Sequence, residues 1–190
     1  MDVEAYEQRV RSRPCFICAF LSGDPDYEHE VVLEDEDHIA FLDRYPTLPG
    51  KLLVAPKRHL EHVIRDLDEV AYLRLMRFVR TVAQAVESAM PVERTYLYTL
   101  GSQQGNAHLH WHIAGLPPGV PYRDQQFHAL MTENGVLAEH EHDHAQTLGR
   151  LRSAAQSAVR DSSPVSATTR AMNAGETTCG GGADRSGRPR

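Results

Sequence analysis

Hydrophobic residues along the first 116 positions follow two different periods, which predicts several strands and one long helix. Between Asp66 and Pro91 apolar residues recur every three or four positions, and this spacing is typical of a helix that covers one face of a sheet. Elsewhere short apolar runs are separated by turn residues, as is typical of strands. The expected elements are a short helix over 2–12, strands over 31–33, 39–43, 51–55, 96–100 and around 108–114, and the long helix over about 67–90.

Turn residues and a candidate helix cap set the boundaries of these elements. The first two strands are expected to form a hairpin. Asp66, followed three residues later by Glu69, resembles a capping box at the start of the long helix, and Pro91 ends that helix. Five strands with one dominant helix predict an α+β fold, in which the helix covers one face of an antiparallel sheet.

The last third of the chain differs in composition from the rest. After a proline-rich loop, helical segments are expected over 123–132 and 136–159. From Asp161 onward Ser, Thr, Gly, Arg and Pro dominate, and such a segment cannot bury enough apolar surface to offset the cost of ordering it. The sequence therefore predicts one domain over 1–116, a C-terminal helical extension over 117–160 and a disordered basic tail over 161–190.

The charge of the chain is unevenly distributed. Residues 150–190 contain seven arginines and three acidic residues, a net charge of +4, so residues 1–149 carry −10 of the total of −6. A body this acidic argues against general nucleic-acid binding, which depends mainly on Lys and Arg at phosphates. No apolar run approaches the ~18 residues of a membrane helix, and the N-terminus lacks the pattern of a signal peptide, so we expect a cytoplasmic protein without a membrane partner.

Three histidines at alternate positions form the most informative segment of the chain. In an extended strand, residues two apart share a face, so His108, His110 and His112 would lie together while Leu109 and its apolar neighbours pack into a core. In a helix the three imidazoles would spread over about 200° of arc, so the strand is favoured. Three interpretations are open: a structural role, a three-histidine catalytic metal site, or phosphate chemistry with one imidazole as the nucleophile.

A second H-x-H-x-H pattern shows that the spacing alone is not specific. In His140-Glu141-His142-Asp143-His144 the intervening residues are acidic and the segment falls in an expected helix. It is therefore interpreted as a polar surface. The segment at 108–112 differs because its spacing residues are apolar and because a turn rich in Gly, Gln and Asn precedes it, whose N–H groups can face phosphate oxygens.

The histidine segment also resembles the signature of the histidine-triad (HIT) family of nucleotide-binding hydrolases and transferases. The resemblance runs from Gln104 through the three histidines to Ile113-Ala114. Phe41-Leu42-Asp43 resembles the family's purine- and ribose-contacting strand, and residues 54–59 (VAPKRH) resemble its V-x-P-K-x-H segment. Together these motifs cover roughly Cys15 to Ala114, and they imply a HIT-like fold in the domain over 1–116.

The resemblance also implies a set of roles at a purine nucleotide. His110 would attack the α-phosphorus of a nucleoside phosphoramidate, anhydride or dinucleoside polyphosphate and form a nucleotidyl-histidine. His112 would bind the phosphate and assist proton transfer. The nucleotide would be contacted by Phe41 at the base, Asp43 at the ribose, and Gln104 and the turn residue Asn106 near the phosphate. For Phe41, simple core packing is an equal alternative.

Two alternatives to this enzyme remain open, and two positions depart from the family pattern. A nucleotide-sensing protein with little turnover is one alternative, and a zinc metallohydrolase that uses all three histidines is the other. Many family members carry Asn on the strand before the turn, where this chain has residues 97–100 (LYTL), and a small hydroxyl residue where it has Gly105. These departures leave the leaving group undetermined.

Cys15 and Cys18 form a CxxC pair, which favours metal binding or redox chemistry over a structural disulfide in a cytosolic chain. A CxxC pair supplies half of a four-ligand zinc site. Related HIT proteins and the similar galactose-1-phosphate uridylyltransferases bind a structural zinc with CxxC and two histidines. The resemblance therefore implies His59 and His108 as the other ligands, with His62 as a weaker substitute for His59, and it implies a homodimer.

Overall fold

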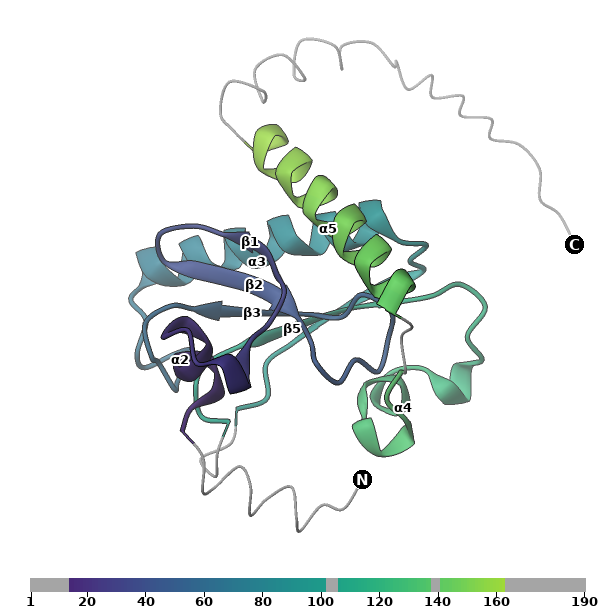
Figure 1. The fold of residues 1–190 in the computed structure, drawn as a ribbon, viewed down its shortest axis with the longest axis horizontal. Coiled ribbons are helices and arrows are strands. Elements are labelled where there is room, and N and C mark those ends of the chain that lie inside the picture. Colours follow the sequence, from purple (N-terminus) through teal and green to yellow (C-terminus); the bar gives the residue numbers. More distant parts are fainter. Residues whose placement is uncertain (1–13, 102–105, 138–140, 163–190) are drawn as a thin grey trace, which may run out of the picture.

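The chain forms one five-stranded sheet with helices on both faces (Figure 1). The computed structural model describes residues 14–101, 106–137 and 141–162. The expected helix over 2–12 and all but the first two residues of the expected tail lie outside these ranges. The helices and strands are α2 (Phe16–Leu21), η1 (Pro25–Tyr27), β1 (Val31–Glu34), β2 (His38–Leu42), β3 (Leu52–Pro56), α3 (Glu69–Ala89), β4 (Arg94–Tyr98), β5 (Trp111–Leu116), η2 (Tyr122–Asp124), α4 (Phe127–Leu130), η3 (Thr132–Asn134) and α5 (Glu141–Asp161).

The strands follow the order β1-β2-β3-β5-β4, and every neighbouring pair is antiparallel. The predicted α+β class is confirmed, and so is the hairpin of β1 and β2. β5 lies between β3 and β4, which places the histidine segment next to the V-x-P-K-x-H segment. This order brings residues about 50 positions apart in the sequence into one site.

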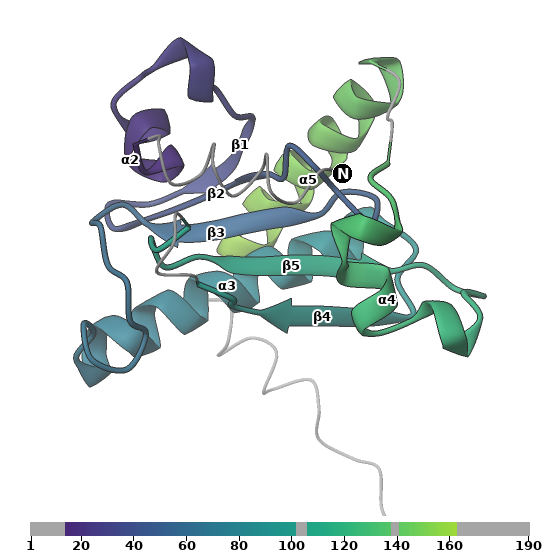
Figure 2. The same cartoon turned by 90° about the horizontal axis from the view of Figure 1, so that it is seen from below.

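The two faces of the sheet are covered by different helices (Figure 2). The helices α3 and α5 pack on one face, over a core to which α5 contributes Leu148, Leu151 and Ala155. The helix α2 packs on the other face, where Ile17 and Phe41 belong to one apolar cluster. The predicted position of the long helix over one face is therefore confirmed, and the opposite face carries a smaller apolar cluster with α2.

The cap of α3 lies two residues beyond the predicted one. The carboxylate of Asp68 accepts a hydrogen bond from the backbone N–H of Ala71 and caps the helix. Asp66 instead accepts hydrogen bonds from the backbone N–H groups of Glu61 and His62, which fixes the loop before the helix. The prediction of Asp66 as the cap was wrong. An Asp side chain accepts hydrogen bonds from backbone N–H groups in loops as well as at the start of a helix, and the sequence does not distinguish the two.

Three other boundaries differ from the sequence prediction. β4 begins two residues before the predicted strand, since Glu93 already donates its N–H to the Leu116 carbonyl. The expected helix over 123–132 is broken into short pieces at Gln126, whose φ of 55° is incompatible with a continuous helix. The last long helix begins at Glu141, within the expected range of 136–159, and extends to Asp161.

The histidine strand is shorter than predicted, because β5 begins at Trp111 and contains only His112 of the three. The N–H of Leu109 is bonded to the Leu60 carbonyl rather than to a strand, and the hydroxyl of Thr99 donates to the His110 carbonyl. The predicted separation of faces is nevertheless confirmed. Leu109, Ile113 and the half-buried Trp111 all pack in the core on the α3 side.

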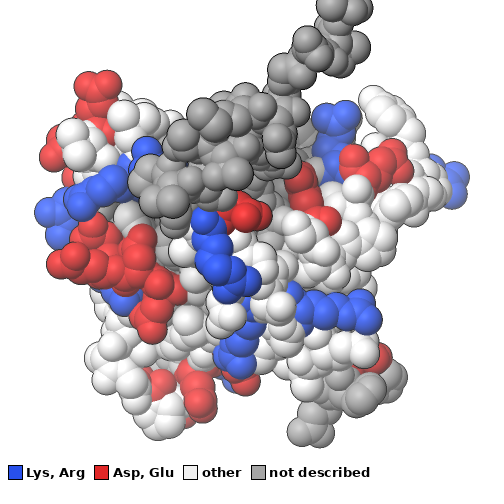
Figure 3. Space-filling model, turned by 90° about the horizontal axis from the view of Figure 1, so that it is seen from above, with Lys and Arg blue, Asp and Glu red and all other residues white. Residues whose placement is uncertain are grey.

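Within the described residues, no helix has the length and apolar character needed to cross a membrane. Acidic and basic side chains are interspersed on the face shown in Figure 3.

Candidate functional site

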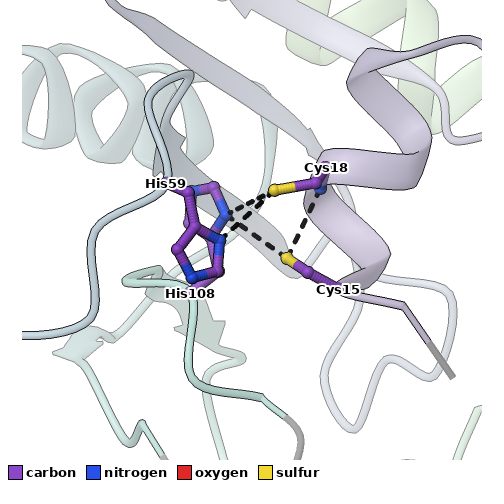
Figure 4. Close-up of side chains that lie close together, drawn as sticks. All are labelled: Cys15, Cys18, His59 and His108. Carbon is purple, nitrogen blue, oxygen red and sulfur yellow. Dashed lines mark hydrogen bonds between the residues drawn. The ribbon is translucent and has the colours of Figure 1, made fainter. Parts of the chain in front are cut away.

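Four potential metal ligands from three separate segments converge beside α2 (Figure 4). Cys15 and Cys18 lie at the start of α2, His59 follows β3, and His108 precedes β5. Their ligand atoms all lie within 4.8 Å of one another. His62 lies outside this group, and its Nε2 is 2.6 Å from a guanidinium nitrogen of Arg65.

Three sulfur–nitrogen separations within this cluster match a tetrahedral zinc site. With zinc–sulfur bonds of about 2.3 Å and zinc–nitrogen bonds of about 2.0 Å, tetrahedral angles place S and N about 3.5 Å apart. Nδ1 of His108 lies 3.4 Å from Sγ of Cys15 and 3.6 Å from Sγ of Cys18, and Nδ1 of His59 lies 3.3 Å from Sγ of Cys18. The donor set and its spacing therefore fit zinc.

The outer nitrogens of both histidines have acceptors that orient the rings. Nε2 of His108 lies 2.9 Å from the Pro56 carbonyl, which can only accept, so Nε2 carries the proton and Nδ1 faces the thiols with its lone pair. Nε2 of His59 lies 3.4 Å from the carboxylate of Glu61. Histidines that bind a metal commonly donate the N–H of the other ring nitrogen to a carbonyl or carboxylate in this way.

Burial shifts the pKa values of the imidazole and thiol groups in opposite directions, and each shift favours the uncharged form. Burial lowers the pKa of His108 to about 4, with a smaller contribution from the neighbouring His59, so this imidazole is neutral at pH 7. Burial and the adjacent Cys15 raise the pKa of the Cys18 thiol to about 11. A bound metal cation would lower the pKa of the Cys18 thiol instead, because a coordinated thiol is deprotonated.

His110 is buried and held in one tautomer. Its Nδ1 lies 2.7 Å from the backbone carbonyl of His108, so Nδ1 carries the proton and Nε2 bears the lone pair. The ring meets Phe16 edge-on at 5.8 Å between centroids. Burial lowers the pKa of His110, and the Lys51 ammonium lowers it further against the opposing effects of the His108 carbonyl and Asp43.

His112 lies on the same face as His110, with 5.0 Å between the ring centroids. It stacks on Tyr98 of the neighbouring strand, with centroids 4.6 Å apart and planes at 4°. Burial lowers the pKa of His112 to about 3, with smaller contributions from His110 and Lys51. Its Nδ1 is buried and has no hydrogen-bond partner among the described residues.

The three histidines do not form a single cluster of candidate metal ligands among the described residues. Of the described residues, the grouped metal donors are the two cysteines with His59 and His108, and this group excludes His110 and His112. The triad is divided between a cluster with metal-site geometry and a pair of neutral imidazoles.

Asp43 acts electrostatically on both imidazoles, and Phe41 lies on the same face of the sheet. One carboxylate oxygen of Asp43 lies 2.9 Å from the Lys51 ammonium, and the other accepts a hydrogen bond from the N–H of Tyr45. Phe41 is fully buried and meets the rings of Phe20 and His29 at 5.1 and 4.9 Å between centroids. Burial and Arg44 lower the pKa of His29 against the opposing effects of Asp43 and the Leu42 carbonyl.

The structure does not describe Gln104, and it adds two residues that the sequence did not single out. Asn106 is half-buried just before the histidine segment. Lys51 and Tyr98 both approach the imidazole pair, although neither belongs to a motif. A signal for Lys51 was present: it lies two residues before Leu53 at the start of an apolar strand, on the same face as Leu53.

The fold and the site define an α+β protein with paired imidazoles beside a Cys₂His₂ cluster, and comparison with known proteins gives its family. A model of the HIT domain matches residues 25–118. The Protein hit of Bacillus subtilis is 32% identical over 104 residues, which cover 54% of this chain and 70% of that protein. An uncharacterised HIT-like protein of Saccharolobus solfataricus is 31% identical over 103 residues, which cover 52% of this chain and 71% of that protein. The chain belongs to the HIT family, within the superfamily of nucleotide-binding hydrolases and transferases.

Solved structures agree with this assignment. A hypothetical histidine triad nucleotide-binding protein from Sulfolobus tokodaii matches with a TM-score of 0.62 and 25% identity, over 78% of this chain and 96% of that one. A zinc-bound histidine triad family protein from Mycobacterium smegmatis matches with a TM-score of 0.56 and 21% identity, over 77% and 96% of the two chains. The second likeness establishes the shared fold.

Proposed function

We propose that this protein hydrolyses or transfers the nucleotidyl group of a nucleoside 5′-phosphate derivative through a covalent intermediate on His110. The observation that carries the proposal is the 2.7 Å contact between Nδ1 of His110 and the His108 carbonyl. It leaves Nε2 as an unprotonated nitrogen, and a neutral imidazole is an effective nucleophile toward phosphorus.

The reaction has two steps that balance at phosphorus. Nε2 of His110 forms a bond to the α-phosphorus as the bond to the leaving group breaks, and the leaving group takes the electron pair and a proton. Water or another acceptor then attacks the phosphorus and gives its proton to His112, the P–N bond breaks, and His110 returns to its neutral state. A nucleotidyl-histidine divides one difficult displacement into two easier ones.

His112 is proposed to bind the phosphate. As a neutral imidazole it can donate one hydrogen bond to a phosphate oxygen, and the negative charge of the phosphate raises its pKa once the substrate is bound. The bound substrate thereby allows His112 to hold a proton and pass it to the leaving group. The proximity of His110 and His112, at 5.0 Å between centroids, supports this division of roles.

The nucleoside would bind over the same face of the sheet. Asp43 presents a carboxylate held by Lys51 that can accept hydrogen bonds from the ribose hydroxyls, and the aromatic group of Phe41, Phe20 and His29 is proposed to flank the base. Asn106 and Gln104 are proposed to contact the phosphate from the turn before the histidine segment.

Cys15, Cys18, His59 and His108 are proposed to hold a structural zinc ion. Four protein ligands complete a tetrahedral shell and leave no open position for a substrate. When bound, zinc would stabilise the segment that carries His108. The protein itself orients the two histidine ligands: the Pro56 carbonyl holds His108, and the Glu61 carboxylate holds His59.

A turnover assay tests the nucleophile. A relative from Danio rerio named adenosine 5′-monophosphoramidase HINT3 is 40% identical over 65 residues, which cover 34% of this chain and 40% of that protein, and this motivates an adenosine 5′-phosphoramidate as the first substrate. His110→Ala is expected to abolish turnover, whereas the matched control His128→Ala, at an exposed site on α4, should leave it unchanged. Equal rates for His110→Ala and the wild type would refute the proposal, and nucleotide binding without turnover in the wild type would favour a sensor.

A further inference from the structure

Lys51 is a buried cation in a chain whose basic residues are mostly arginine. Only two of its 20 basic residues are lysines, and the side chain of Lys51 is 4% exposed. Burying an ammonium group is costly unless an opposite charge accompanies it. Its charged partner is Asp43, whose carboxylate lies 2.9 Å away and is 12% exposed.

The strand register places this pair at the edge of the proposed nucleoside site. β2 and β3 pair from His38↔Pro56 to Leu42↔Leu52, and the N–H of Asp43 bonds to the carbonyl of Lys51 just beyond the last pair. Asp43 and Lys51 therefore stand directly opposite each other, and period two puts them on the same face as the Phe41↔Leu53 pair.

The contacts of Asp43 fix the rotation of its carboxylate. Oδ2 lies against the Lys51 ammonium, while Oδ1 accepts from the N–H of Tyr45 at 2.9 Å. With one lone pair of each oxygen engaged, the remaining lone pairs point in set directions. A carboxylate that must accept from two adjacent hydroxyl groups benefits from this preorganisation, because its side chain loses less conformational freedom on binding.

We propose that Lys51 is a positioning residue, which acts through Asp43 to hold its carboxylate in the orientation that accepts the ribose hydroxyls of the nucleotide. This inference rests on the proposed function. A purely structural ion pair is the competing explanation, although buried ion pairs seldom stabilise a fold more than an apolar pair of similar volume. The two explanations differ in one measurable quantity. If Lys51 positions Asp43, its loss weakens the part of nucleotide affinity that depends on the ribose hydroxyls.

The test is a cycle that combines Lys51 variants with removal of the ribose hydroxyls. Dissociation constants are measured for the full chain with adenosine 5′-monophosphate and with its 2′,3′-dideoxy analogue. Lys51→Met should weaken binding of the ribonucleotide about tenfold more than binding of the dideoxy analogue, the size of a lost hydrogen bond to a charged group. The loss of the ammonium beside His110 and His112 affects both ligands alike and cancels in this ratio. Lys51→Arg should restore part of the loss, and in an Asp43→Asn background Lys51→Met should have no further ribose-dependent effect.

The control is Lys57→Met, which removes the only other lysine from an exposed ion pair with Glu34. It should leave both dissociation constants unchanged. Melting temperatures check that each variant is folded, and Lys51→Gln replaces Lys51→Met if the latter does not fold, with the same ribose-dependent loss expected. Equal weakening for the two ligands would overturn this inference alone. A wild-type protein that binds neither ligand would overturn the proposed function and this inference with it.

Discussion

The backbone carbonyl of His108 accepts a hydrogen bond from Nδ1 of His110 at 2.7 Å, while the His108 ring faces two thiols with its own Nδ1. One residue therefore joins the Cys₂His₂ cluster to the proposed nucleophile. Whatever fixes the His108 ring also fixes the carbonyl that sets the tautomer of His110. The cluster and the nucleotide site are expected to respond together when the cluster is disturbed.

Loss of a cysteine ligand should remove the metal and destabilise the fold. We predict one zinc per chain for the wild type and none for Cys15→Ser, with a free energy of unfolding lower by several kcal/mol, since metal binding is coupled to folding. His110 chemistry should survive in part. The measurements are metal analysis, thermal unfolding and turnover of the same preparations.

Cys179→Ser is the matched control for this prediction, because Cys179 lies in the tail, far along the sequence from the cluster. It should retain the zinc and the melting temperature of the wild type. Zinc that survives in Cys15→Ser but is lost in His110→Ala and His112→Ala would contradict the assignment and favour a three-histidine site.

The lowered pKa of His112 should make the fold sensitive to acid. In the unfolded chain this imidazole gains its proton near pH 6.5, whereas in the folded chain it does so only near pH 3. Its contribution to stability is therefore complete above pH 6.5 and is lost as the pH falls toward 3, because the unfolded state binds the proton first.

His112→Phe preserves an aromatic ring against Tyr98 but cannot titrate. We predict that its free energy of unfolding, measured by urea titration at several pH values, declines less steeply between pH 6 and pH 4 than that of the wild type. His128→Phe, at an exposed position, should have the wild-type slope. Parallel curves for His112→Phe and the wild type would show that burial of His112 does not govern its protonation.

Gly115 in β5 allows close packing against the end of α3 and the segment that follows it. A Cβ at this position would lie 2.6 Å from Cγ2 of Val92 and 3.2 Å from Cγ1 of Val86. We predict that Gly115→Ala lowers the free energy of unfolding by about 1–3 kcal/mol through overpacking. Gly149→Ala in α5 meets nothing within 4 Å and should stabilise by about 0.5–1 kcal/mol, since alanine favours a helix. Chemical denaturation of both variants measures their free energies of unfolding. An unchanged value for Gly115→Ala would contradict this packing.

The sequence was most informative where one physical pattern determined the result. Alternation of histidines with apolar residues correctly placed Leu109 and Ile113 in the core and His112 on the opposite face. The start of the strand was less predictable, because it depends on the Leu109–Leu60 and Thr99–His110 hydrogen bonds, which join segments distant in sequence.

Convergence of side chains from different strands was harder to predict. The strands containing Asp43 and Lys51 were both expected, but their register was not, so the ion pair between them remained hidden. The helix α2, which presents Cys15 and Cys18, is only six residues long and too short to show a helical period. The ligand set came from family resemblance, and the structure brings those four residues together.

The central claim is that His110 is the nucleophile, and a trapped intermediate tests it most directly. Wild-type protein is mixed with an adenosine 5′-phosphoramidate, stopped in alkaline denaturant where a phosphorus–imidazole bond survives, and digested for peptide mass spectrometry. We predict an adenylyl group on the peptide spanning 108–112, located at His110 by fragmentation and absent from His110→Ala. Turnover of the substrate without any such adduct, or an adduct that persists in His110→Ala, would contradict the claim.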